Sequence, residues 1–170
     1  RRSPVYGQQF IEGEPCSAVY VGDGRRAHLL GLTRQLVGES WLHAAPFRYC
    51  GSIGPLSPGV VRPPVLDRLG SALASGCGLR GLFGVDGVLR DTVFWPVEIN
   101  PRYTASVEVH EYATGLTALT WHRLAGALGT LPPPLPPPDE APPCVGKAIL
   151  FSRAPLTFPA DGPWLSVLRS

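Results

Sequence analysis

Hydrophobic positions near the start of the chain come in short runs that are typical of β-strands. The segment QQFIEGEPCSAVYV, residues 8–21, predicts two strands around a turn at residues 13–15, and Asp23-Gly24 predicts a further turn after them. Residues 27–37 fit either a helix or another strand, because a glycine and a threonine weaken their helical pattern. The pattern therefore predicts the beginning of a sheet and leaves the third segment open.

The middle of the chain changes pattern twice. Glycine and proline recur between residues 47 and 64, which predicts an irregular loop. Apolar residues then follow helical spacing from Leu66 to Ser75, and the glycines after them predict the end of that helix. Two apolar runs, residues 79–88 and 93–99, flank a polar turn, and this is the pattern of a β-hairpin.

The last third combines helical periodicity with a proline-rich break. Residues 104–128 predict one long helix, or two helices with a break at Thr114-Gly115. LPPPLPPPDEAPP, residues 131–143, predicts an extended spacer, with a ligand for an SH3 or WW module as the alternative. The segment GKAILFS beyond it predicts a strand. No internal repeat is visible, so one layered α and β unit is expected.

Composition excludes several classes of protein. The 170 residues fit one domain, and a net charge of +2 is too weak for a nucleic-acid footprint. No apolar run approaches the roughly 18 residues of a membrane span.

Four widely spaced cysteines predict isolated, buried thiols in a reducing cytoplasm. Because the sequence starts at Arg1 with neither an initiator Met nor an apolar leader, we expect it to begin inside a longer cytoplasmic protein.

Acidic and amide side chains gather on the predicted hairpin. Asp86 lies near the end of its first strand, and alternation places Glu98 and Asn100 on one face of the second. Carboxylate and amide oxygens without a thiol or imidazole suit Mg²⁺, and Arg102 can hold a carboxylate or phosphoryl oxygen. Each residue also has an ordinary structural explanation, since Asp before Gly and Asn before Pro are common in turns. These residue types leave a metal or phosphate site and a plain turn both open.

The strings GVDG and VEINPR resemble the closing hairpin of ATP-grasp enzymes. This resemblance implies that Asp86, Glu98 and Asn100 bind two Mg²⁺ ions, or Mn²⁺ in their place, between the protein and ATP. It also implies that Arg102 steadies an acyl phosphate or the acceptor. EINPRYTASVE is similar to ATP-grasp proteins associated with tetrahydromethanopterin-linked one-carbon metabolism and to archaeal tyramine-glutamate ligases.

The segment QQFIEGEPCSA resembles the hinge that holds adenine in the same superfamily. The resemblance makes the backbones of four residues candidates for adenine binding: Gln8, Gln9, Phe10 and Ile11. Many members carry a ribose-binding Glu two residues after the hinge glycine, where this chain has Pro15. Glu12 and Glu14 are the candidate substitutes. Arg48, Tyr49 and Ser52 are candidates for shaping an acceptor pocket, with an ordinary surface loop as the alternative.

The implied fold is α+β: the C-terminal subdomain of an ATP-grasp fold, an antiparallel sheet flanked by helices. Residues 1–130 would form the C-terminal portion of the ATP-grasp domain, residues 131–143 a polyproline linker, and residues 144–170 a short β extension. The family's phosphate-binding lysine strand and Gly-rich loop are not recognisable in this sequence, and Lys147, its single lysine, is not assigned to phosphate. We therefore expect the chain alone to be catalytically incomplete.

The implied function is an ATP-dependent, Mg²⁺-dependent ligase that joins a carboxylate to an amine or similar nucleophile through an acyl phosphate. Its partners would be small-molecule substrates, with no nucleic acid and no membrane, and a homo-oligomer is left open. One alternative is a nucleotide-binding but inactive regulatory or scaffold domain. Another is an interaction module that acts through the polyproline segment.

Overall fold

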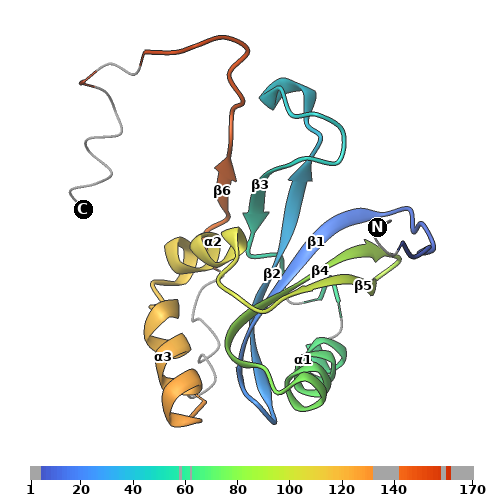
Figure 1. The fold of residues 1–170 in the computed structure, drawn as a ribbon, viewed down its shortest axis with the longest axis vertical. Coiled ribbons are helices and arrows are strands. Elements are labelled where there is room, and N and C mark those ends of the chain that lie inside the picture. The colour runs from blue at the N-terminus through green and yellow to red at the C-terminus, as the bar shows by residue number, and fades with distance from the viewer. Residues whose placement is uncertain (1–4, 58, 62, 132–141, 158–159, 162–170) are drawn as a thin grey trace.

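The computed structural model contains a six-stranded antiparallel sheet with helices on both faces (Figure 1). It describes residues 5–57, 59–61, 63–131, 142–157 and 160–161. The strand order is β5-β4-β1-β2-β3-β6. The expected fold class, an α+β fold with an antiparallel sheet flanked by helices, is confirmed. Residues 132–141 of the predicted polyproline spacer lie outside the described residues, so the spacer stays a prediction.

Nine regular elements and one short 3₁₀ turn make up the described fold. The strands are β1 (Glu14–Asp23), β2 (Ala27–Val37), β3 (Tyr49–Gly54), β4 (Arg80–Arg90), β5 (Val93–Asn100) and β6 (Val145–Ala148). The helices are η1 (Ser40–Leu42), α1 (Pro63–Cys77), α2 (Ala105–Thr114) and α3 (Ala118–Leu128). Among the described residues, no helix is long and apolar enough to cross a membrane.

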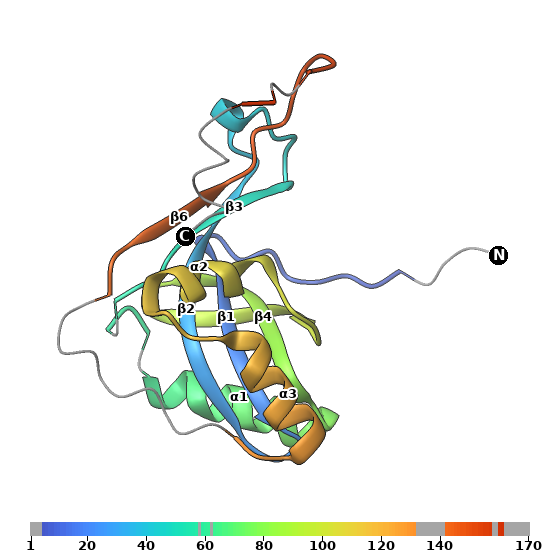
Figure 2. The same cartoon turned by 90° about the vertical axis from the view of Figure 1, so that its left-hand side faces the viewer.

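Strand β1 lies at the centre of the sheet and packs on both of its faces. Its alternate side chains divide between two cores, since successive residues of a strand point to opposite faces. Ala18 and Tyr20 join the core under α1, whereas Val19 and Val21 join the core under α2 and α3. Figure 2 shows α3 in front of the sheet and α1 behind it. Two helical layers therefore enclose the central strands.

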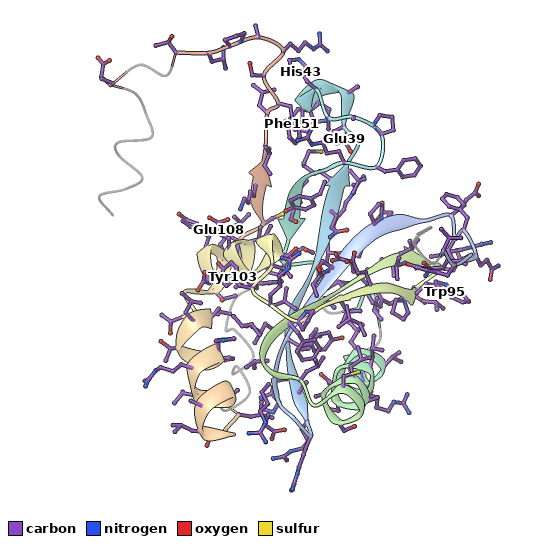
Figure 3. All side chains as sticks on the ribbon, in the orientation of Figure 1. Glu39, His43, Trp95, Tyr103, Glu108 and Phe151 are labelled. Atoms are coloured by element: carbon purple, nitrogen blue, oxygen red, sulfur yellow. The ribbon has the colours of Figure 1, made fainter. Side chains whose placement is uncertain are left out.

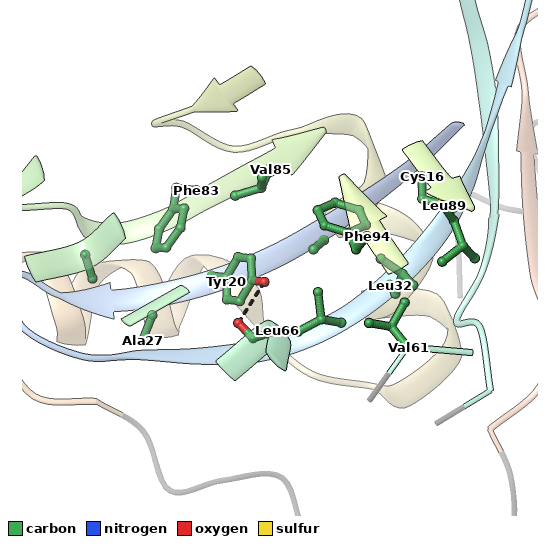
Figure 4. Close-up of a cluster of buried hydrophobic side chains, with 12 residues drawn as sticks. Cys16, Tyr20, Ala27, Leu32, Val61, Leu66, Phe83, Val85, Leu89 and Phe94 are labelled. Atoms are coloured by element: carbon green, nitrogen blue, oxygen red, sulfur yellow. Dashed lines mark hydrogen bonds between the residues drawn. The ribbon is translucent and has the colours of Figure 1, made fainter. Parts of the chain in front are cut away.

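Tyr20 anchors α1 to the sheet (Figure 4). Its ring stacks on Phe83 of β4 with centroids 5.1 Å apart, and its hydroxyl donates a hydrogen bond of 3.1 Å to the carbonyl oxygen of Leu66. A buried hydroxyl without such a partner would be destabilising. Gly70 of α1 faces the same ring, so the absence of a side chain there lets the helix approach.

Helices α2 and α3 are separate, which confirms the two-helix alternative. Gly115 takes a left-handed conformation with φ of 70° and ends α2. Glu111 then links the two helices, because its carboxylate accepts hydrogen bonds from the Ala118 backbone N–H at 2.9 Å and from the Tyr103 hydroxyl at 2.9 Å. Burial, followed by this contact with Glu111, raises the pKa of Tyr103.

Three expectations from the hydrophobic pattern need correction. Residues 8–12 form no strand, and the predicted turn at residues 13–15 is instead the start of β1, where Glu14 and Pro15 pair with β4. Residues 27–37, which the pattern left open between helix and strand, form strand β2. The predicted loop at residues 47–64 contains β3. Gly51 lies within this strand, where a side chain would collide with the Lys147 carbonyl oxygen of the neighbouring β6. Glycine there permits close strand approach and does not break the strand.

The four cysteines are all free, as expected, but only two are buried. Cys16 and Cys50 are fully enclosed, and burial raises the pKa of Cys16 to about 11. Cys77 and Cys144 are exposed, so the expectation of buried thiols is wrong for both. Cys77 is the last residue of α1, and Cys144 immediately precedes β6, positions where the core does not reach.

Two glycines of α1 provide a matched test of how this helix packs against Tyr20 of β1. Gly70→Ala should lower the free energy of unfolding by about 2 kcal/mol, because the added methyl group would collide with the Tyr20 ring. Gly76→Ala should raise it by roughly 0.5–1 kcal/mol, since that position is exposed and open and alanine is the better helix former. Urea unfolding of both variants measures the difference. Equal effects would contradict the described contact between α1 and β1.

Buried His110 makes stability depend on pH. Its two ring nitrogens have no hydrogen-bond partner among the described residues, and burial lowers its pKa to about 4. The unfolded state, with a pKa of about 6.5, binds the proton more tightly, so the free energy of unfolding should fall by up to about 3 kcal/mol between pH 6.5 and 4. His110→Leu should flatten this slope and exposed His43→Gln should retain it. An unchanged slope in His110→Leu would contradict the assignment.

Candidate functional site

The β4–β5 hairpin brings the candidate metal-binding residues together. Asp86 lies directly opposite Glu98 in the antiparallel register, and Asn100 lies opposite Gly84. Because paired residues share a face and alternate positions repeat it, the three side chains lie on one face of the sheet. Glu98 is exposed, Asp86 is half-buried, and Asn100 is 8% exposed. The sequence predicts one shared face for Glu98 and Asn100, and the register adds Asp86 to it.

A hydrogen-bonded chain fixes the Asp86 carboxylate. Gln35 of β2 donates from Nε2 to Oδ1 at 2.9 Å, and Asn100 of β5 donates from Nδ2 to Oδ2 at 2.9 Å. Arg102 donates from Nη2 to Asn100 Oδ1 at 3.1 Å. Each acceptor oxygen keeps a second lone pair for another ligand. Three strands thus meet at one carboxylate that can still coordinate a cation.

Gln35 is a member of the site that sequence analysis missed. It lies 51 residues before Asp86 in the chain, on a segment whose secondary structure the pattern left open. Once residues 27–37 are known to form β2, alternation places Gln35 on the same face as buried Thr33. Only the strand order, with β1 between β2 and β4, brings it within reach of Asp86.

These side chains line a pocket of about 470 Å³. One wall carries Asp86, Glu98, Asn100 and Arg102. The remaining walls come from β1, β2, β3 and the start of α2, and they contribute mainly hydroxyl, amide and apolar groups, including Ser17, Gln35, Tyr49, Thr104 and Ser106. Asp86 and Glu98 are the two acidic residues of this lining, and Ser17 lies beside Asp86 in the β1–β4 register.

The residues of the predicted adenine hinge line a second pocket, of about 440 Å³. Residues 8–11 form one side of it, and Val88 and residues 95–97 of the hairpin form the other. Trp95 lies at the outer end of the hairpin, on the side where the chain enters (Figure 3). Phe47 lines both pockets, so the second pocket adjoins the first.

A β-bulge aligns the two pockets along one face of the hairpin. Asp86 pairs with Glu98, whereas the next residue of β4 pairs with Pro96, so Val97 is the extra residue. Val88 consequently pairs with Trp95 on the same face as Asp86 and Glu98. Simple alternation would have sent Trp95 and Glu98 to opposite faces. Proline in a strand is tolerated at such bulges, which is the signal that could have revealed it.

The donor set suits Mg²⁺, which shares its coordination with water and phosphate, better than a metal ion that takes all its ligands from the protein. Among the described residues, no three His, Cys, Asp or Glu side chains converge on one point. Two carboxylates and the Asn100 amide oxygen supply hard oxygen ligands, and Mg²⁺ usually completes its coordination with water and phosphate oxygens. The residues present thus fit an ion that is shared with a phosphate ligand.

The other candidate residues lie in different surroundings. Tyr49 lines the larger pocket, whereas Arg48 points to Phe151, with its guanidinium carbon 4.0 Å from the ring centroid. Lys147 forms an ion pair with Glu108 beside a separate pocket. Pro15, which stands where the resemblance expects a ribose-binding glutamate, pairs with Val88 in the sheet.

Neither candidate substitute for the ribose-binding glutamate lines the two pockets. Glu14 lies 3.9 Å from Arg34, and Glu12 is exposed. The ribose-binding residue therefore has no assignment among the described side chains.

One curated relative shares this region at the sequence level. The carbamoyl phosphate synthase large chain of Micrococcus luteus is 29% identical over 119 residues, which are 66% of this chain and 10% of that protein. The chain thus spans about a tenth of the length of this relative.

Several solved structures share the fold at low sequence identity. The biotin carboxylase subunit of pyruvate carboxylase matches with a TM-score of 0.57 and 18% identity, over 74% of this chain and 27% of that one. The biotin carboxylase domain of a single-chain bacterial carboxylase matches with a TM-score of 0.54 and 21% identity, over 75% and 29%. The urea amidolyase of Kluyveromyces lactis gives a TM-score of 0.55 and 16% identity, over 71% and 7%. These matches show a common fold.

A family model settles the relationship. The model of the ATP-grasp domain matches residues 3–106, which is more than half of the 170 residues and contains both pockets' principal walls. The match includes the hinge-like segment and the complete hairpin with Asp86, Glu98 and Asn100. The chain belongs to the ATP-grasp domain family.

Proposed function

We propose that this chain forms the nucleotide- and metal-binding half of an ATP-dependent ligase that joins a carboxylate to an amine or similar nucleophile. The observation that carries the proposal is the pair of adjoining pockets on one face of the hairpin. One has the apolar lining that a nucleobase needs, and the other has the oxygen ligands that a phosphate-bound cation needs. Their adjacency, through the shared lining residue Phe47, suits a ligand with a base at one end and phosphates at the other.

The smaller pocket would take the adenine of ATP. Val88, Trp95 and Val97 offer apolar surface from the hairpin, and the backbone of residues 8–11 lies across from them. Residues 5–12 belong to no strand or helix, so their backbone N–H and C=O groups are not committed to regular pairing. Such groups can hydrogen-bond to the edge of a purine, as the hinge does in the family that this segment resembles.

The larger pocket would take the phosphates together with Mg²⁺. Asp86, Glu98 and Asn100 would hold the ion, which when bound neutralises phosphate charge during transfer. Gln35 would keep the Asp86 carboxylate oriented. Arg102 would grip the transferred phosphoryl group or the acyl phosphate, because its guanidinium is positioned by Asn100 and retains free N–H donors.

The proposed reaction has two steps. A substrate carboxylate oxygen attacks the γ-phosphorus of ATP, the bond to the bridging oxygen breaks, and ADP leaves with that electron pair. The nitrogen of the amine then attacks the acyl carbon, phosphate leaves, and the nitrogen loses a proton. No protein nucleophile is needed, and the residues of the pocket contribute positioning and charge stabilisation.

A second candidate function is a nucleotide-binding domain without turnover. The arrangement around Pro15 favours it, because Pro15 pairs within the sheet and Glu14 faces Arg34, so neither supplies a ribose ligand. Such a domain would bind Mg·ATP without consuming it. Product formation by the full-length protein, assayed with pools of carboxylic acids and amines, distinguishes the two.

Glu98→Gln tests the metal assignment. Removing one negative charge from an exposed side chain should leave the fold intact and weaken Mg·ATP binding to the full-length protein at least about tenfold. Asp91→Asn in the hairpin turn is the matched control, since it removes the same charge outside the pocket and asparagine tolerates the positive φ of 50°. Isothermal titration with and without Mg²⁺ measures both. Equal affinities for the two variants would refute the assignment.

Trp95→Ala tests the adenine assignment. Loss of the indole should weaken binding of ATP and of adenosine alike. The expected loss is about tenfold, which corresponds to about 1.4 kcal/mol of aromatic contact. Glu98→Gln should leave adenosine affinity unchanged, because adenosine has no phosphate. Trp121→Ala, on the remote helix α3, is the control for aromatic loss. If Trp95→Ala bound adenosine normally, the smaller pocket would not be the adenine site.

A further inference from the structure

The orientation of Arg102 depends on the short segment that joins β5 to α2. Residues 101–104 lie between these two elements and belong to neither of them. The guanidinium of Arg102 donates from Nη2 to Asn100 Oδ1 at 3.1 Å and from Nη1 to the backbone carbonyl oxygen of Tyr103 at 3.2 Å. One partner is a candidate metal ligand. The other is a backbone atom, whose position depends on how the joining segment is held.

An exposed arginine needs such partners to keep a single orientation. Arg102 is exposed, and an unrestrained arginine side chain samples many rotamers. The contact with Asn100 restrains one end of the guanidinium, and the Tyr103 carbonyl restrains the other. Arg102 therefore stays directed at the larger pocket as long as the peptide unit after Tyr103 is fixed.

The side chain of Tyr103 is fixed by Glu111 of α2. Tyr103 is 37% exposed, yet its hydroxyl donates a hydrogen bond of 2.9 Å to Glu111 Oε2, eight residues further along the chain. Figure 3 places Tyr103 beside α2. Burial, followed by the contact with Glu111, raises the pKa of Tyr103, so the phenol keeps the proton that it donates. Tyr103 is thus held by its hydroxyl and holds Arg102 with its carbonyl.

Glu111 is itself fixed by the start of α3. Its Oε1 accepts a hydrogen bond of 2.9 Å from the backbone N–H of Ala118, the first residue of that helix. Thr117, the N-cap of α3, makes no side-chain capping bond among the described residues, so Glu111 supplies an acceptor that the helix start needs. The partial positive charge of a helix N-terminus also favours a carboxylate there. One oxygen of Glu111 therefore binds α3 and the other binds Tyr103.

We propose that Tyr103 and Glu111 are positioning residues for Arg102, and that Glu111 acts through Tyr103. Hydrogen bonds then connect α3 through these two residues to the guanidinium at the pocket. This role rests on the proposed function, because it needs Arg102 to grip the phosphoryl group that is transferred. Loss of the connection should weaken the hold on the γ-phosphate and leave the rest of the nucleotide in place.

The ratio of ATP to ADP affinity measures this hold on the γ-phosphate. Isothermal titration of the full-length protein with Mg·ATP and with Mg·ADP gives the two Kd values. Tyr103→Phe removes the hydroxyl and keeps the ring. It should lower the preference for ATP about fivefold, the effect of one typical hydrogen bond, with the ADP Kd unchanged. Glu111→Gln should act likewise, since an amide has one acceptor oxygen where the carboxylate has two.

Two results of this titration would overturn the proposal. The first is an unchanged ratio in either variant. The second is an equal weakening of ATP and ADP, because that is the result of a purely structural role in packing α2 and α3.

A double-mutant cycle tests whether Tyr103 acts through Arg102. In the Arg102→Ala background, Tyr103→Phe should cause no further loss of the preference for ATP. A further loss there would show that Tyr103 acts independently of Arg102 and would overturn the proposal. Tyr112→Phe and Glu108→Gln are matched controls on the same helix, because Tyr112 is 67% exposed and Glu108 is paired with Lys147. Both should keep the wild-type ratio, and a fivefold loss in either would overturn the assignment.

The nucleotide-free protein separates this inference from the proposed function. Relaxation of ¹⁵N in the Arg102 Nε–H group reports how well the guanidinium is ordered without any ligand. Its order parameter should fall to below about 0.6 in Tyr103→Phe and stay at the wild-type value in Tyr112→Phe. That fall without any Mg·ATP binding would support the positioning and refute the ligase. Mg·ATP binding with an unchanged Arg102 order parameter would refute the positioning and leave the ligase standing.

Discussion

The two hydrogen bonds that hold the Asp86 carboxylate are the constraint on which this site depends. Their donors come from β2 and β5, the strands that lie on either side of the β1–β4 pair. A carboxylate beside buried strands is costly unless its oxygens are satisfied, and these two bonds satisfy both oxygens while leaving lone pairs for a cation. The strand order that brings β2 and β5 to Asp86 therefore also determines the geometry of the candidate metal site.

The hairpin was the most predictable part because its information is local. Glu98 and Asn100 are two residues apart in a strand, so alternation alone places them on one face, and the structure agrees. The bulge at Val97 was not predictable from alternation, and it decides that Trp95 joins the same face. The contact between Gln35 and Asp86 could not be predicted, since only the strand order brings the two residues together.

The corrected elements share a physical cause. Segment 47–64 reads as loop because glycine and proline dominate it, yet Gly51 is required for β6 to approach β3. Residues 8–12 read as strand because of their apolar content, yet no partner strand pairs with them among the described residues, and they line a pocket instead. In both places, tertiary context overrides local preference. Membership of the ATP-grasp family is likewise carried by motifs, and the pattern of apolar residues alone indicates only an α+β fold.

The central claim is that ATP and a divalent ion meet at Asp86, Glu98 and Asn100. Mn²⁺ in place of Mg²⁺ provides the most direct measurement, because this paramagnetic ion broadens resonances of nuclei near it. In the full-length protein with ATP, substoichiometric Mn²⁺ should broaden the amides of these three residues before those of β6, the strand at the opposite edge of the sheet. Broadening centred away from the hairpin, or independent of ATP, would contradict the account.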